Sequence, residues 1–141
     1  MGMFAGIDEV EVHQKARYIE PGNYLVEVQA VKQGRTNQGD KPYFLAELKI
    51  LESDNPDFSE GAAVTWITML HKYKKYFLQD TKGFVSIATG SEPEEVTEDV
   101  IEFVTGDEQP LVGVNLRARA WTKVNENTGR GFTETDFTLA S

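Results

Sequence analysis

The sequence predicts a mainly β fold of five strands with a helical insertion between the third and the fourth strand. Apolar and polar residues alternate in five segments, which is the period of strands with one buried face. Between the third and fourth segments, apolar residues recur at threes and fours, which is the period of a helix. A chain of 141 residues, 40% hydrophobic and 26% charged, suits one globular domain.

The first two predicted strands form a hairpin over residues 24–51. In the first strand, one face carries Tyr24, Val26, Val28 and Ala30, and the other carries Leu25, Glu27, Gln29 and Val31. A polar connection with two glycines, residues 34–42, leads to the second strand at 43–53. The third strand covers 62–70, and Trp66 is expected in the core because it shares a face with Val64.

Two helices are expected next. Residues 71–90 have helical spacing, and Gly90 is a natural stop. Residues 91–106 read as a second, acidic helix in which Ser91 and Glu94 resemble a capping box. Its predicted apolar stripe consists of Val96, Val100, Phe103 and Val104.

The last two strands are predicted at 110–124 and 132–140, joined by a glycine-rich turn. Three strands, a helical insertion and a closing hairpin match the requirements of a five-stranded OB-like barrel, although a plain α+β sandwich has the same order of elements. We therefore expect an N-terminal arm at 1–20 and one OB-like domain at 21–141.

The fourth predicted strand carries the most distinctive pattern of the chain. Its even positions are apolar and suit the barrel interior, whereas its odd positions point outward. The outward residues include Arg117, Arg119, Trp121 and Lys123. An indole between cations suits single-stranded nucleic acid, because bases stack on the ring while the cations pair with phosphates. A solvated strand face with one half-buried tryptophan is the competing interpretation.

Other predicted elements supply the same residue types near this stripe. Candidate binding residues lie on the outward face of the second strand, at the first hairpin tip and at the last hairpin tip. They are Lys32, Arg35, Lys41, Tyr43, Lys49, Arg130 and Phe132. In OB folds the sheet face and these two hairpin loops form the usual nucleic-acid surface. A second basic and aromatic cluster at 71–77 could extend the groove, but its helical spacing favours Tyr73 and Phe77 as core residues and the lysines as solvated ones.

The negative charge of the chain is concentrated in one segment. The net charge is −9, yet eight of the 23 acidic residues lie between Lys82 and Arg117, where no lysine or arginine occurs. The remaining 15 acidic residues nearly balance the 14 basic ones. A binding face can therefore be locally cationic in an acidic protein, because the local field decides attraction.

These segments resemble bacteriophage single-stranded DNA-binding proteins of the OB-fold type. The resemblance spans about residues 20–139 and rests on the two strands of the first hairpin, the tryptophan-containing third strand, "KKYFLQD" with its helix, and "RARAWTKVNENTGRGF". It implies sequence-tolerant binding of DNA exposed in replication or recombination. A homodimer, replication or recombination proteins as partners, and a host-cell cytoplasmic location follow from the same resemblance.

Two features depart from that family. Many members end in a flexible acidic tail, whereas this chain ends in "TDFTLAS" and carries its acids at 91–106. Two predicted helices between the third and fourth strands also exceed the usual single one. The resemblance therefore does not extend to tail-mediated recruitment or to the number of helices between these two strands.

The sequence supports catalytic hypotheses less well than it supports the binding hypothesis. Asp40, Glu47 and Lys49 faintly resemble a metal-dependent nuclease pattern, but seven residues separate the acids and Lys49 is equally a surface cation. His13 and His71 belong to no catalytic or metal-ligand pattern. We therefore expect no enzyme activity and no cofactor or metal. The alternative function is a structural or protein-interaction module that uses the acidic helix.

The absence of cysteine excludes disulfides and thiolate chemistry and fits a reducing compartment. The N-terminus has no basic region followed by a long apolar run, so no secretory signal is expected. No apolar stretch approaches the length needed to span a membrane.

Overall fold

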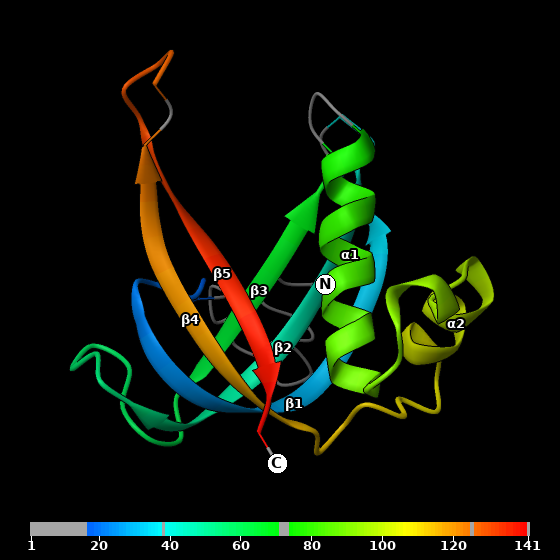
Figure 1. Ribbon diagram of the computed structural model, residues 1–141, viewed down its shortest axis with the longest axis horizontal. Helices are drawn as coiled ribbons and strands as arrows, with labels where there is room; N and C mark the ends of the chain where they lie inside the picture. The colour runs from blue at the N-terminus through cyan, green and yellow to red at the C-terminus, as the bar shows by residue number, and fades with distance from the viewer. Residues whose placement is uncertain (1–16, 38, 71–73, 125, 141) are drawn as a thin grey trace, which may run out of the picture.

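The computed structural model describes residues 17–37, 39–70, 74–124 and 126–140 and is mainly β, as the sequence predicts. Five antiparallel strands form one sheet with the order β3-β2-β1-β4-β5 (Figure 1). The strands are β1 (Gly22–Arg35), β2 (Pro42–Ser53), β3 (Ala63–Met69), β4 (Asn115–Val124) and β5 (Gly131–Leu139). The chain also contains α1 (Lys74–Thr89), a short 3-10 turn η2 (Pro93–Glu95) and α2 (Glu98–Thr105) between β3 and β4.

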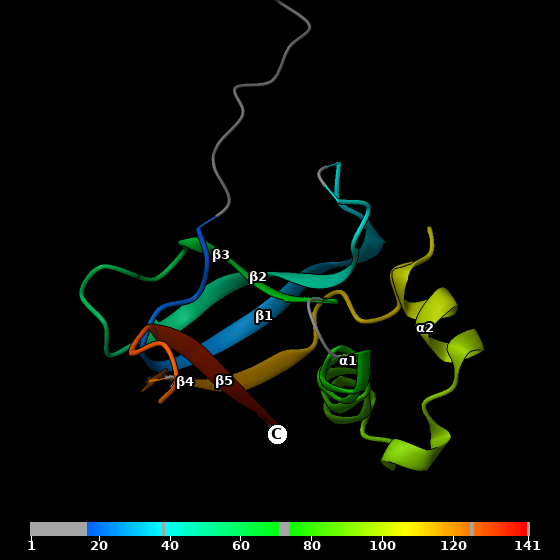
Figure 2. The ribbon, with the colours of Figure 1, turned by 90° about the horizontal axis from the view of Figure 1, so that it is seen from above.

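The sheet is strongly curved, and α1 lies along its open side (Figures 1 and 2). Within the described residues, β3 and β5 are the two edge strands and do not pair with each other. The sheet is therefore open between them, and the closure of a barrel is not seen.

An aromatic cluster occupies part of the space between the two edge strands and α1. The Trp66 ring of β3 stacks on Phe84 of α1, with centroids 5.1 Å apart and planes inclined by 18°. Phe137 of β5 meets the rings of Trp66 and Phe84 edge-on. Trp66 packs against the core as predicted but is only partly buried, and α1 covers apolar surface that β3 and β5 would otherwise expose.

The alternation predicted for β1 is correct as far as Val28 and wrong beyond it. Val31 is fully buried, whereas Ala30 is only partly buried. The pairing of β1 with β2 shifts register between Val28 and Ala30. Such a bulge inserts one extra residue, so the following side chains exchange faces.

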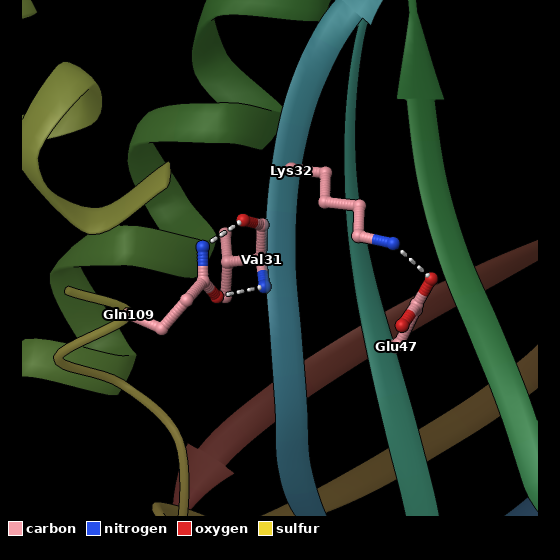
Figure 3. Close-up of polar contacts among 4 residues, drawn as sticks. All are labelled: Val31, Lys32, Glu47 and Gln109. Atoms are coloured by element: carbon pink, nitrogen blue, oxygen red, sulfur yellow. Dashed lines mark hydrogen bonds and ion pairs between the residues drawn. The ribbon is translucent and has the colours of Figure 1, made fainter. Parts of the chain in front are cut away.

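Beyond Glu27, no strand of the described part of the chain pairs with β1 on the side of β4. β4 pairs with β1 only from Gly22 to Glu27. Further along, the side-chain amide of Gln109 takes the place of a strand (Figure 3). The Val31 N–H donates to Gln109 Oε1 at 2.8 Å, and Gln109 Nε2 donates to the Val31 carbonyl at 2.9 Å.

The segment predicted as one acidic helix, 91–106, is divided into η2 and α2. The predicted capping box is wrong, because Ser91 lies in the turn after α1, where its carbonyl accepts a hydrogen bond from the Ser86 hydroxyl. Helix α2 instead begins after Thr97, whose hydroxyl accepts from the Val100 N–H. Phe103, predicted in the apolar stripe, is 54% exposed because it lies on the outer side of this shorter helix.

The strand predicted from residue 110 begins only at Asn115. Gly113, with φ of +92°, forms part of a turn before it, and Val112 is exposed. Val124 is also exposed, since it lies at the end of β4 beyond the core. The predicted interior positions Leu116, Ala118 and Ala120 are confirmed as buried.

The described part of the predicted arm is attached to β3. Ile19 is buried, its N–H donates to the Thr65 carbonyl, and the Thr65 N–H donates to the Arg17 carbonyl. Residues 1–16 lie outside the described residues. None of the described helices has the length and apolar composition needed to cross a membrane.

Candidate nucleic-acid interface

The predicted stripe lies on the outward face of β4. Arg117, Arg119 and Lys123 are exposed, whereas Trp121 is half-buried. Strand alternation causes this arrangement, because Leu116, Ala118 and Ala120 pack into the core, although Thr122 near the end of the strand is exposed. The structure therefore brings together the four residues that the sequence singled out on this strand.

The antiparallel register places acidic side chains from β5 on the same face. Residues directly opposite each other in the β4–β5 ladder share a face of the sheet. The outward pairs are Arg117 with Thr138, Arg119 with Asp136, Trp121 with Glu134, and Lys123 with Phe132. The stripe is therefore a band of mixed charge rather than a purely cationic one.

Only part of this positive charge is neutralised within the protein. Lys123 Nζ lies 3.4 Å from Glu134 Oε1, in an exposed ion pair of the kind that contributes little to stability. Arg117, Arg119 and Arg130 make no ion pair with any described residue. These three guanidinium groups are available to an anionic ligand.

Two aromatic rings lie near the tip of the β4–β5 hairpin. Trp121 and Phe132 are diagonal neighbours across the ladder, and Phe132 is 45% exposed. The Arg119 guanidinium carbon lies 5.5 Å from the centroid of the Trp121 ring, within the range of a cation–π contact. This contact orients the indole and places a positive charge beside it.

Arg117 and Arg119 also border a groove of about 600 Å³ on the outward side of β1 and β4. Leu25 and Asn23 line the same groove, as do the carboxylates Glu52, Asp54 and Asp136. Asp54 accepts hydrogen bonds from the Asn23 backbone N–H at 2.7 Å and from its side-chain amide at 2.8 Å. These bonds, the backbone one most strongly, lower the pKa of Asp54 below its ordinary value.

The candidates on the first hairpin form a separate group. Lys32 Nζ lies 2.9 Å from Glu47 Oε1 (Figure 3), and Arg35 Nη1 lies 3.5 Å from Asp40 Oδ2. Lys49 is exposed on β2 and lies opposite Glu27 of β1 on the outward face. Lys41 and Lys49 form no ion pair with a described residue.

Tyr43 is less available for stacking than its place in the sequence pattern predicts. It is half-buried and lies opposite Gly34 in the β1–β2 ladder. A Cβ atom at Gly34 would lie only 2.7 Å from the Tyr43 hydroxyl oxygen, so the phenol covers this glycine. The ring therefore packs against the hairpin itself.

Both hairpin tips and the first turn of α1 lie at the same end of the molecule (Figure 1). Seen from that end, the three segments lie apart from one another, at different corners of the molecule (Figure 2). The tips carry Lys41 and Arg130, and α1 begins with Lys74 and Lys75, all of which are exposed. The acidic helix α2 lies away from the β4–β5 hairpin (Figure 1).

The remaining sequence candidates have ordinary partners or lie outside the described residues. Asp40 and Glu47, from the nuclease-like pattern, pair with Arg35 and Lys32, respectively. The described residues contain no group of three or more side chains arranged to hold a metal ion. His13 and the segment 71–73 are outside the described residues.

A groove of about 530 Å³ between β3, β5 and α1 adds another acidic site that sequence reasoning missed. Asp80 and Glu134 line it, and Asp80 shares a hydrogen bond with the Thr68 hydroxyl at 3.2 Å. Loss of solvent around Asp80, with a smaller effect of the Glu134 charge, raises its pKa above the ordinary value.

Sequence reasoning also missed that the β5 carboxylates face the stripe. Alternation along the last strand puts Glu134 and Asp136 on one face, but it does not align that face with β4. The glycine-rich turn before Gly131 was the signal, because the length of a hairpin loop sets the register of its strands.

Comparison with known proteins gives no assignment. No protein-family model matches the sequence, and a search of curated proteins finds no significant match.

Proposed function

We propose that this protein binds single-stranded DNA without strong sequence preference and without catalysis. The proposal rests mainly on one observation: Trp121, Phe132 and Arg119 lie together on one outward face of the β4–β5 hairpin. Stacking on aromatic rings tolerates any base, since every base has a π face, and cations bind the phosphates between the bases. The proposal requires no cofactor and concerns strands exposed in phage replication or recombination.

The arrangement of the strands supports this proposal. We interpret the curved five-stranded sheet as OB-like, with the open side between β3 and β5 covered by α1. In OB folds, the β1–β2 and β4–β5 loops flank the nucleic-acid surface. The two corresponding hairpin tips lie at the same end of this molecule (Figure 1).

The acidic residue Glu134 affects which cations of the hairpin are free to bind phosphates. Glu134 holds Lys123 in the free protein, so a phosphate must compete for that lysine. Arg117, Arg119 and Arg130 face no such competition within the described residues. We therefore assign the phosphate contacts first to these arginines and the base stacking to Trp121 and Phe132.

Replacing Trp121 with alanine should weaken binding to single-stranded DNA by about 1–3 kcal/mol, or roughly 5- to 150-fold, because a stacked base loses its ring. Trp121→Phe should recover most of the affinity. Val124→Ala, which removes an exposed apolar side chain from the same hairpin, serves as the matched control. Fluorescence anisotropy with labelled oligonucleotides measures all four proteins.

The titrations should include single-stranded DNA, RNA and duplex DNA of equal length. Tight binding to single strands with weak binding to duplex supports the proposal, and the RNA series measures the preference between the two nucleic acids. A folded wild-type protein that binds none of them at low salt would overturn it. Unchanged affinity in a folded Trp121→Ala variant would remove the stacking role.

A further inference from the structure

A cavity of about 650 Å³ lies between the β1–β2 hairpin, α1 and α2, and we call it the helix cavity. Its apolar lining includes Phe77, Leu78 and Ile101, and its cationic residues are Arg35, Lys74 and Lys82. The volume is in the range of sites that accept a sizeable apolar group. An apolar floor with a charged rim favours a partner that combines both properties.

The positive charge of the helix cavity is largely uncommitted. Lys74 and Lys82 form no ion pair with a described residue, and Arg35 is held only by the exposed Asp40 at 3.5 Å. Glu98 is the one carboxylate among the described lining residues. The rim therefore keeps a net positive charge and favours an acidic partner.

The opposite chemistry occurs on the outer face of α2, defined by Asp99, Glu102 and Phe103. All three residues are exposed, and 54% of Phe103 is accessible to solvent. Asp99 precedes Phe103 by four residues, so the two side chains are neighbours on the helix surface. The outer face thus presents an aromatic ring next to carboxylates.

The Phe103 side chain of this outer face points away from the helix cavity of its own chain. Ile101 lines the cavity, and Phe103 lies two residues later, about 200° around the helix axis. One copy therefore cannot fill its own cavity with Phe103. A second copy can, because Phe103 and the cavity lie on different sides of α2, while Glu102, four residues after the cavity-lining Glu98, lies between them.

We propose that the outer face of α2 of one copy docks into the helix cavity of a second copy. Phe103 enters the apolar floor, while Asp99 and Glu102 meet Lys74 and Lys82. The contact joins two different surfaces, so it is a head-to-tail interface that can extend to further copies or close into a ring. It uses none of the residues of the β4–β5 hairpin and does not depend on DNA binding.

The test is self-association of the full chain without nucleic acid, followed by sedimentation velocity over a range of protein concentrations. Wild type should associate increasingly with concentration. Phe103→Ala should weaken association at least tenfold. Lys82→Glu and Asp99→Lys should each weaken it similarly, because each places like charges across the interface.

Mixing the two charge-reversed variants gives the decisive result. A Lys82→Glu cavity is complementary to an Asp99→Lys helix, and the other two surfaces of the mixed pair are unchanged. The mixture should therefore associate as wild type does, although neither variant does so alone. Lys75→Glu and Asp107→Lys make the same charge changes outside the cavity and the outer face, and they should leave association unchanged.

Monomeric wild type at every concentration would overturn the proposal, as would equal association of wild type and folded Phe103→Ala. Failure of the mixture to recover association would assign the effect of the single variants to something other than this contact. Each of these outcomes leaves the proposed DNA binding untouched, because that function is measured by separate titrations on the β4–β5 hairpin.

Discussion

At the scale of single residues, Asn23 and Asp54 form several hydrogen bonds with each other in the groove beside Arg117. Both Asp54 carboxylate oxygens accept hydrogen bonds from Asn23, and the Asp54 N–H donates to the Asn23 carbonyl at 3.1 Å. This pair ties the start of β1 to the end of β2. Because the bonds favour the ionised carboxylate, the folded protein lowers the pKa of Asp54.

The consequence is a pH-dependent stability. With its folded pKa below the ordinary value of 3.8, Asp54 contributes stability above that value, and the contribution disappears as the pH falls through the folded pKa. Asp54→Asn should lower the melting temperature at neutral pH, and the difference from wild type should shrink below about pH 4. Thermal unfolding between about pH 7 and pH 2 measures this, with Glu52→Gln as control. A difference that stays constant with pH would contradict the ionic origin.

At the scale of elements, β1 depends on a side chain to complete its hydrogen bonding. Beyond its pairing with β4, the amide of Gln109 satisfies both backbone groups of Val31, whose side chain is fully buried. Gln109 adopts a left-handed conformation with φ of +45°, which costs energy for a residue other than glycine. The hydrogen bonds therefore offset a local backbone strain.

Removing this amide should destabilise the protein even when the strain is also removed. Gln109→Gly relieves the left-handed conformation but leaves two part-buried backbone groups without partners, so we expect a loss of about 1–3 kcal/mol. Urea unfolding gives the free energy. Gln33→Ala, which removes one exposed hydrogen bond to Thr105, should cost less. Equal or higher stability of Gln109→Gly would show that the strain outweighs the bonds.

At the scale of the whole molecule, the opposite charges occupy different regions. The acidic segment around α2 lies away from the β4–β5 hairpin, whose face carries the uncommitted arginines (Figure 1). Local charge governs the approach of an anionic ligand more than the net charge of −9 does. An acidic protein can therefore still attract phosphates at one end.

A salt titration tests this charge distribution. Each phosphate contact releases counterions, so log affinity for single-stranded DNA should fall linearly with log salt, by roughly 0.7 per contact. Arg119→Ala should make the slope shallower by about one contact and weaken binding to poly-dT and to a mixed sequence by similar factors. Asp136, which lies opposite Arg119, provides the converse variant: Asp136→Asn should strengthen binding. An unchanged slope in folded Arg119→Ala would remove this residue from the phosphate contacts.

The sequence by itself determined the five strands, the helical character of the segment between β3 and β4, and the faces of β4 from Leu116 to Trp121. A two-residue period places Leu116 inside and Arg117 outside through local chain geometry alone, so this prediction needed no knowledge of distant contacts. The same local reasoning predicted that Trp66 belongs to the core. The proposed aromatic and cationic residues of the last hairpin were recognisable for the same reason.

Only the tertiary structure decided which residues from other segments contact these strands. The bulge before Ala30, the Gln109 amide on Val31 and the carboxylate of Glu134 beside Lys123 all arise from contacts between segments distant in sequence or from strand register. A one-residue shift in register moves every following side chain to the other face, and residue periodicity within one strand carries no information about its partner. The local sequence therefore sets which side chains each face carries. The packing of the whole chain sets which residues lie beside that face and what net charge the face has.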